Sequence, residues 1–66
     1  MLNGLKIREL RTLKGYTTLD LSRFTNISKS YLEELERGDK KNPSFSKVVY
    51  IAKALGVKVD ELIMNV

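Results

Sequence analysis

The segment from Thr17 to Gly38 constrains the fold more than any other part of the chain. It holds two short stretches whose apolar residues recur at helical spacing, separated only by Thr25–Ser28. Asn26 is the turn residue in this break, because asparagine tolerates the left-handed backbone better than most residues. Four residues are too few to connect an antiparallel hairpin with long arms. The sequence therefore predicts two short helices that meet at a sharp bend.

Capping residues predict where these helices and their neighbours begin and end. Thr17 and Asp20, three residues apart, form a capping-box-like pair at the start of the second helix, and Asn26 ends that helix. Ser28 and Ser44 are expected N-caps, and Gly15, Gly38 and Gly56 are expected to follow helix ends. The predicted helices are Gly4 to about Lys14, Thr17 to Asn26, Lys29 to about Arg37, Ser44 to Gly56, and a short one around Asp60 to Met64.

The apolar positions of these helices predict the core. The expected core residues are Ile7, Leu10, Leu21, Leu32, Leu35, Phe45, Ala52 and Leu55. Leu13 continues the three-residue spacing of the first helix, and Phe24 extends the inner face of the second. In the last helix, Leu62 and Ile63 are expected to be buried. The sequence contains no persuasive strand.

Length and composition allow one small domain, residues 1–66, of the all-α class. The chain has 66 residues, no cysteine and no histidine. These absences exclude disulfides and thiolate zinc sites, and remove the side chain most used in acid–base catalysis near neutral pH. We therefore expect no enzyme, no metal and no cofactor. The formal net charge of +4 suits a polyanionic partner, although many small domains are mildly basic for solubility alone.

The order and spacing of several short motifs resemble the XRE-type helix-turn-helix family, which includes the phage Cro and repressor proteins. The matching segments are Ile7–Arg11, Lys14–Thr17, Ile27–Leu32, Leu35–Gly38, Asn42–Ser44 and Ile51–Val57. The pieces Lys-Gly-Tyr, Lys-Ser-Tyr-Leu and Asn-Pro-Ser are similar to the Sin-repressor branch. The resemblance implies a compact five-helix, lambda-repressor-like domain with its helix-turn-helix at about residues 17–38. Its third helix would read bases in the major groove.

The same resemblance implies roles for individual residues. Base contacts are expected from Ser28, Lys29, Ser30 and Glu34, with Lys29 donating to guanine and Glu34 accepting from cytosine. The expected phosphate contacts are Thr17, Thr18, Tyr31, Arg37, Lys40, Lys41 and Asn42. Arg11 and Glu36 match a pair that often joins the first and third helices in the family. At Thr18 this sequence departs from the many relatives that carry glutamine. The shorter hydroxyl is expected to reach one phosphate oxygen, but not to bridge also to a base or to the recognition helix.

Each of these roles has a simpler alternative. Lys29 is spaced to pair with Glu33 on the helix surface, which would stabilise the helix by a few tenths of a kcal/mol. Lys40 and Lys41 also suit a solvated loop. Tyr31 also suits a packing role that keeps its hydroxyl in water.

The leading functional hypothesis is a bacterial or phage transcriptional regulator, a repressor or activator, that binds double-stranded DNA as a homodimer. The dimer would use the last helix, with Ile63, Met64 and Val66, or an exposed Tyr50, unless the chain is part of a longer regulator. The absence of a signal peptide or long apolar run predicts a cytoplasmic protein, on the nucleoid when bound to DNA. The competing hypothesis is a protein-interaction module of the same fold, such as an antitoxin or anti-repressor. Thr18 and the acidic third helix favour it.

Overall fold

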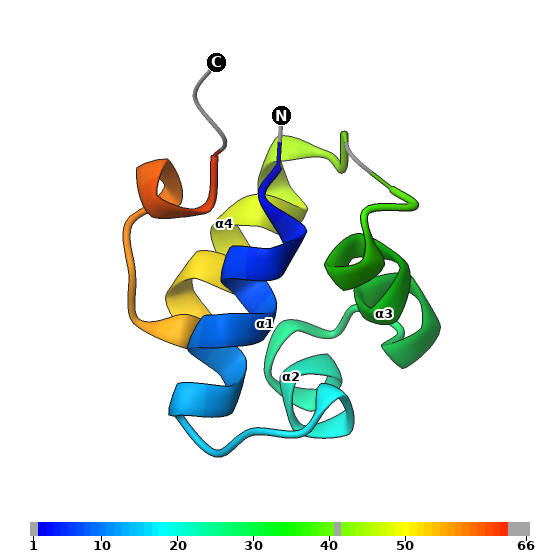
Figure 1. The fold of residues 1–66 in the computed structure, drawn as a ribbon, viewed down its shortest axis with the longest axis vertical. Coiled ribbons are helices and arrows are strands. Elements are labelled where there is room, and N and C mark those ends of the chain that lie inside the picture. Colours follow the sequence, from blue (N-terminus) through cyan, green and yellow to red (C-terminus); the bar gives the residue numbers. More distant parts are fainter. Residues whose placement is uncertain (1, 41, 64–66) are drawn as a thin grey trace.

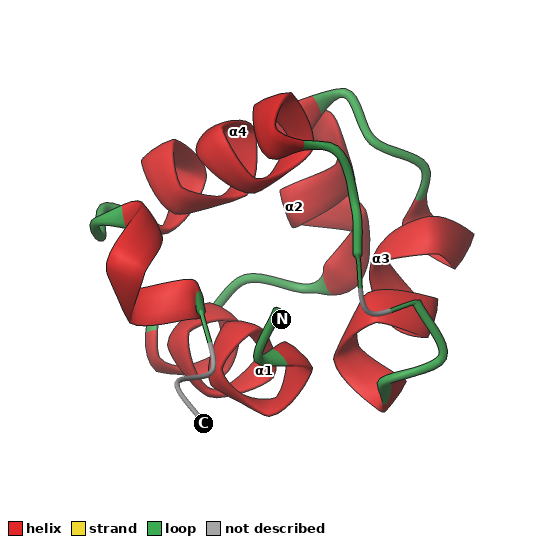
Figure 2. Ribbon diagram, turned by 90° about the horizontal axis from the view of Figure 1, so that it is seen from above, coloured by secondary structure: helices red, strands yellow, loops and turns green. Residues whose placement is uncertain are grey.

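The computed structural model describes residues 2–40 and 42–63 and is all-helical. Four α-helices, α1 (Gly4–Leu13), α2 (Thr18–Thr25), α3 (Lys29–Arg37) and α4 (Phe45–Leu55), are followed by a 3₁₀ turn, η1 (Val59–Leu62). Helices α1 and α4 lie in the middle of the molecule, with α3 and η1 on opposite sides of them (Figures 1 and 2). The all-α class is confirmed, and α3 is left at one edge.

Local hydrogen bonds set the helix boundaries where the sequence predicts them. Thr17, Ser28 and Ser44 are the N-caps of α2, α3 and α4, and each side-chain oxygen accepts from a backbone N–H three residues on. Asn26 ends α2 in the left-handed region, with φ of 61°. These boundaries agree with the sequence within one or two residues.

The fifth helix is a correction. In place of an α-helix from Asp60 to Met64, the chain makes only the four-residue 3₁₀ turn η1, and Met64 lies outside the described residues. Ile63 is already extended and forms an isolated antiparallel bridge with Leu2, while the Asn3 N–H donates to the Leu62 carbonyl at 2.7 Å. This pairing with the start of the chain ends the helical geometry after one turn.

The core joins all five elements. Its fully buried large side chains are Ile7, Leu21, Leu32, Leu35, Ile51, Leu55 and Leu62. The approach of α1 to α3 requires glycine, since a Cβ on Gly4 would lie 2.0 Å from the Leu35 carbonyl oxygen. Ala52 is also buried, and Leu10 packs partly buried against the core.

Three apolar residues are placed differently from the prediction. Leu13, Phe24 and Phe45 are 81%, 59% and 73% exposed. A three-residue step turns only about 300° around an α-helix, so the 7-10-13 series drifts off the inner face by Leu13. Phe24 lies outside the Leu21–Thr25 face and packs edge-to-face on Tyr16, and Phe45 opens α4 before its inner face begins.

Within the described residues, none of the helices has the length and apolar character needed to cross a bilayer.

Candidate nucleic-acid interface

Hydrogen bonds within the segment Leu21–Ile27 shape the turn between α2 and α3. The Asn26 N–H donates to the Ser22 carbonyl at 2.8 Å, and the Ser22 hydroxyl donates to the Ile27 carbonyl. Thr25 is buried, yet its hydroxyl donates to the Leu21 carbonyl at 2.7 Å and accepts from the Ile27 N–H at 3.3 Å. With its polar atoms satisfied, this turn holds α3 at a defined angle to α2.

The outward face of α3 carries polar side chains. Leu32, Leu35 and Glu36 form the buried face, so Ser30, Glu34 and Arg37 project in the opposite direction. Ser30 and Arg37 are exposed, and Glu34 is half-buried. This stripe offers both hydrogen-bond donors and acceptors, as a helix that reads base edges needs.

Two of the residues expected to contact bases lie at the N-terminal end of α3. Ser28 is the N-cap, and its hydroxyl oxygen accepts from the Tyr31 N–H at 3.2 Å while its own proton stays available. Lys29 is half-exposed at one edge of the outward stripe. Ser28 and Lys29 thus lie at the N-terminal end of α3, with Lys29 on the edge nearer α2, whereas Ser30 and Glu34 lie on the outward stripe.

The cations of this surface pair with carboxylates. Lys29 Nζ lies 3.2 Å from Glu33 Oε2, Arg37 Nε lies 2.9 Å from Asp39 Oδ2, and Lys40 Nζ lies 4.0 Å from Glu34 Oε2. The Lys29–Glu33 pair is the helix-surface alternative that the spacing allowed. All three pairs are reached by solvent, so each contributes little to stability.

Lys47 joins this surface without having been anticipated from the sequence. Its Nζ lies 4.2 Å from the centroid of the Tyr31 ring, which places a cation from the first turn of α4 beside α3. The Tyr31 ring thus packs on Lys47 as well as lying next to the outward stripe. The sequence signal was weak, because a lone lysine two residues after a phenylalanine resembles any solvated helix position.

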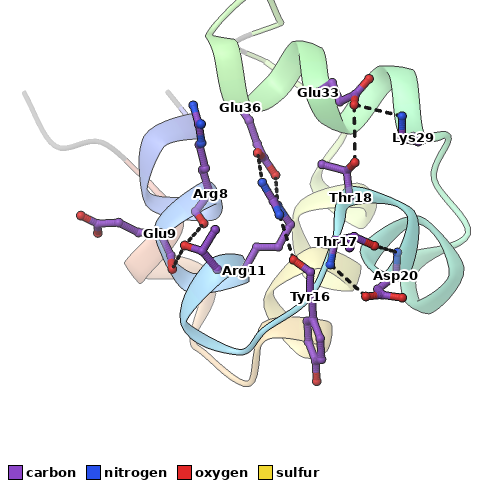
Figure 3. Close-up of polar contacts among 11 residues, drawn as sticks. Arg8, Glu9, Arg11, Tyr16, Thr17, Thr18, Asp20, Lys29, Glu33 and Glu36 are labelled. Atoms are coloured by element: carbon purple, nitrogen blue, oxygen red, sulfur yellow. Dashed lines mark hydrogen bonds and ion pairs between the residues drawn. The ribbon is translucent and has the colours of Figure 1, made fainter.

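The N-terminus of α2 is largely satisfied within the protein. The Thr17 hydroxyl accepts from the Asp20 N–H at 3.0 Å, and the Thr17 N–H donates to Asp20 Oδ2 at 2.9 Å (Figure 3). These backbone and side-chain hydrogen bonds from Thr17 lower the pKa of Asp20 below its ordinary value. The Asp20 charge already compensates the positive end of the helix dipole. Because the Asp20 and Leu21 N–H groups donate to Thr17, only the Thr18 and Leu19 N–H groups remain for a phosphate.

Thr18 faces α3. Its hydroxyl donates to Glu33 Oε2 over 3.5 Å, a long hydrogen bond that links the first turn of α2 to the middle of α3 (Figure 3). The expectation that threonine is too short to bridge to α3 is therefore wrong, because α2 packs close enough to α3 for the hydroxyl to reach Glu33.

Arg11 and Glu36 support α3 from inside. Arg11 Nε and Nη2 donate to the two Glu36 carboxylate oxygens at 2.8 and 3.0 Å, and Nη1 donates to the Tyr16 carbonyl at 2.8 Å (Figure 3). The hydrogen-bonded Glu36 raises the pKa of Arg11 against the effect of burial. The expected contact between these side chains is therefore present, and it ties α1, α3 and the α1–α2 loop together.

Two further phosphate contacts, Lys41 and Asn42, are predicted for the loop before α4. Lys41 is outside the described residues. Asn42 is exposed and lines an apolar hollow of about 380 Å³ with Leu2, Pro43, Phe45, Val48, Val59, Asp60 and Ile63. The structure thus groups Asn42 with this hollow, next to the paired ends of the chain.

A helix-turn-helix has this geometry, with a sharp, hydrogen-bonded turn followed by a helix whose outer face is polar. A helix-turn-helix family model matches residues 7–62. The chain belongs to this family. The resemblance expected from the sequence is confirmed, including the likeness to Sin-type repressors.

Regulators of Bacillus and its phages are among the helix-turn-helix relatives. The immunity repressor of Bacillus phage phi105 is 37% identical over 60 residues, and SinR of Bacillus subtilis is 33% identical over the same length. Both matches cover 91% of the present chain, but only 41% and 54% of the relatives. The chain therefore spans about half the length of these relatives.

Solved helix-turn-helix structures share the fold. SinR in complex with DNA is 33% identical with a TM-score of 0.86, over 91% of this chain and 98% of that one. The restriction-modification controller protein C.AhdI from Aeromonas hydrophila is 35% identical with a TM-score of 0.85, over 91% and 89% of the two chains.

Proposed function

We propose that this chain is a sequence-specific DNA-binding transcriptional regulator, of the repressor type, with α3 in the major groove. The observation that carries the proposal is the outward face of α3, where Ser30, Glu34 and Arg37 project opposite the buried face formed by Leu32, Leu35 and Glu36. The similarity to SinR, which has been solved in complex with DNA, supports it. A protein of this kind works in the cytoplasm, where the nucleoid lies.

Base contacts come from the exposed end and face of α3. Lys29 donates to guanine O6 and N7, Glu34 accepts from cytosine N4, and the hydroxyls of Ser28 and Ser30 donate or accept. For Lys29 and Glu34 this requires exchange of partners, because both are ion-paired in the free protein.

Phosphate contacts surround this reading face. Arg37, Lys40 and Lys47 supply charge on the α3 and α4 side, and Tyr31 supplies a hydroxyl. On the α2 side, Thr18 and the free N–H groups of the first turn receive a phosphate, whereas Thr17 contributes through its cap.

Two copies are needed for useful specificity, because one such domain covers about half a typical operator. We place the dimer contact at the apolar hollow, where Phe45 is exposed and Ile63 is half-buried. Met64 and Val66, which were also expected to take part, lie outside the described residues. Tyr50, 52% exposed on α4, is the alternative contact. A Phe45→Ser variant should shift the protein toward monomer in sedimentation equilibrium, whereas Tyr50→Ser should not.

A second candidate, a module that chiefly binds another protein, is favoured by the compensation of Lys29, Arg37 and Lys40 by carboxylates. The two functions differ in their response to salt. DNA binding weakens steeply, with log K falling by roughly 0.9 per phosphate contact for each tenfold rise in salt.

Selection from random duplex DNA near physiological salt tests the proposal. Enrichment of a two-fold symmetric motif supports a dimeric operator reader. Binding without an enriched motif would leave only a phosphate-binding face, and no retention at low salt would contradict the DNA-binding function.

A further inference from the structure

Glu33 differs from the other carboxylates of the recognition surface because it touches two elements. One oxygen, Oε2, pairs with Lys29 at 3.2 Å and accepts from the Thr18 hydroxyl at 3.5 Å (Figure 3). Asp39 pairs with Arg37 only two residues away, and Glu34 reaches Lys40 only at 4.0 Å. The Glu33 side chain is 39% exposed, so it is partly shielded where α2 meets α3.

This arrangement determines where the Lys29 ammonium lies. Lys29 and Glu33 are one helical turn apart, and their shared edge is turned toward α2 rather than along the Ser30–Glu34–Arg37 stripe. Figure 3 shows Lys29 and Thr18 both reaching the same carboxylate. The cation expected to read a base is therefore held beside the helix end expected to receive a phosphate.

The charge of Glu33 also acts on DNA itself. Any duplex that docks against α3 brings phosphates toward this carboxylate, and Lys29 neutralises it only while the two remain paired. A base pair that offers Lys29 a hydrogen-bond acceptor compensates for weakening of the Lys29–Glu33 ion pair. A base pair without such an acceptor does not. Such a penalty on the wrong partner increases discrimination while lowering affinity.

We infer that Glu33 is a specificity-determining positioning residue, which holds Lys29 at the α2 edge of the recognition helix and penalises DNA that offers Lys29 no acceptor. This inference rests on the proposed DNA-binding function. Glu33 itself needs no contact with a base, because it acts through Lys29.

The test is Glu33→Gln, which keeps an oxygen for Thr18 and removes the charge. Binding is measured by fluorescence anisotropy on the selected operator and on a random duplex over a range of salt. We expect affinity for the random duplex to rise about three- to tenfold and the salt slope to steepen by about 0.9, as Lys29 becomes free for a phosphate. Affinity for the operator should rise less, so the ratio between the two DNAs should fall.

The matched control is Glu9→Gln, which makes the same charge change on α1, on an exposed side chain that points away from α3 (Figure 3). It should leave the ratio between the two DNAs unchanged. In a Lys29→Ala background, Glu33→Gln should no longer alter base preference. Thermal unfolding of each variant verifies that the fold is kept.

Two results overturn the inference in distinguishable ways. If Glu33→Gln and Glu9→Gln change the affinities for the operator and the random duplex by the same factor, Glu33 contributes only net charge. The DNA-binding function then stands. If the unmodified protein enriches no motif, the proposed function itself fails and the inference fails with it.

Discussion

The two faces of α3 use the same chemistry for opposite purposes. On the inner face, Arg11 and Glu36 form a two-pronged ion pair whose side chains are only 13% and 7% exposed. On the outer face, Lys29 pairs with Glu33 at side-chain exposures of 52% and 39%. A buried pair resists separation because each partner would be left poorly solvated, whereas water replaces either partner of an exposed pair. Burial therefore makes one pair part of the architecture and leaves the other free to exchange with DNA.

The largest expected effect comes from removing one partner of the inner pair. Glu36→Ala should lower the free energy of unfolding by about 2–3 kcal/mol, because it removes two charge-assisted hydrogen bonds and leaves the largely shielded Arg11 guanidinium without its carboxylate. Glu33→Ala on the outer face should lower it by less than about 0.5 kcal/mol. Urea unfolding of both variants measures the difference. Equal losses of stability would contradict the claim that the inner pair is structural and the outer pair is not.

A double replacement sharpens the same point. Arg11→Met with Glu36→Leu removes both charges and should restore much of the stability that Glu36→Ala loses. If the double variant is as unstable as the sum of the single ones, the two side chains are not coupled.

The inner face should also be sensitive to shape. Gly4→Ala places a methyl group against the Leu35 carbonyl and should destabilise the fold by about 2–3 kcal/mol, since α1 must move away from α3. Ser30→Ala, on the outer face, is the control and should change the melting temperature little. A Gly4→Ala protein that melts like the parent would show that the α1–α3 contact yields easily.

DNA binding should reverse the ranking of the two faces. Lys40→Ala should weaken binding to all sequences about equally and reduce the salt slope by about 1, as expected for loss of one phosphate contact. Lys29→Ala should also reduce the preference at one base position, by about 1–3 kcal/mol. Neither variant should alter stability, and anisotropy titrations against operator and single-base variants separate the two effects. Unchanged binding in both would mean that the outer face does not dock on DNA.

The smallest effect concerns the cap of α2. The pKa of Asp20 in the folded protein lies below its ordinary value of 3.8, so the ionised form favours folding. Its contribution is complete above pH 3.8 and disappears as the pH falls through the lower, folded-state pKa. Asp20→Asn should therefore melt at a slightly lower temperature than the parent protein near neutral pH. In acid the two proteins should melt at the same temperature. Melting curves between pH 2 and 7 measure it, with Asp60→Asn as the control for removing one carboxylate.

Local chemistry by itself determined the helix-turn-helix of this protein. The cap at Thr17, the left-handed Asn26 and the N-cap Ser28 depend on hydrogen bonds between residues at most four apart, so the sequence alone indicated them. The Arg11–Glu36 contact was indicated by the family resemblance, because its two residues are 25 positions apart.

Only the tertiary structure decided which apolar residues at the edges of the helical pattern are covered and which groups the surface cations meet. Helical spacing placed Phe24 and Phe45 inside, but whether another element covers such a position depends on distant segments. The same holds for η1, which the bridge between Leu2 and Ile63 cuts short, and for Lys47, brought to α3 by packing. The ion pair of Lys29 is local, yet its link to Thr18 through Glu33 exists only because α2 packs on α3. Hydrogen-bonding preferences act along the chain, whereas burial and charge pairing depend on what the folded chain brings together.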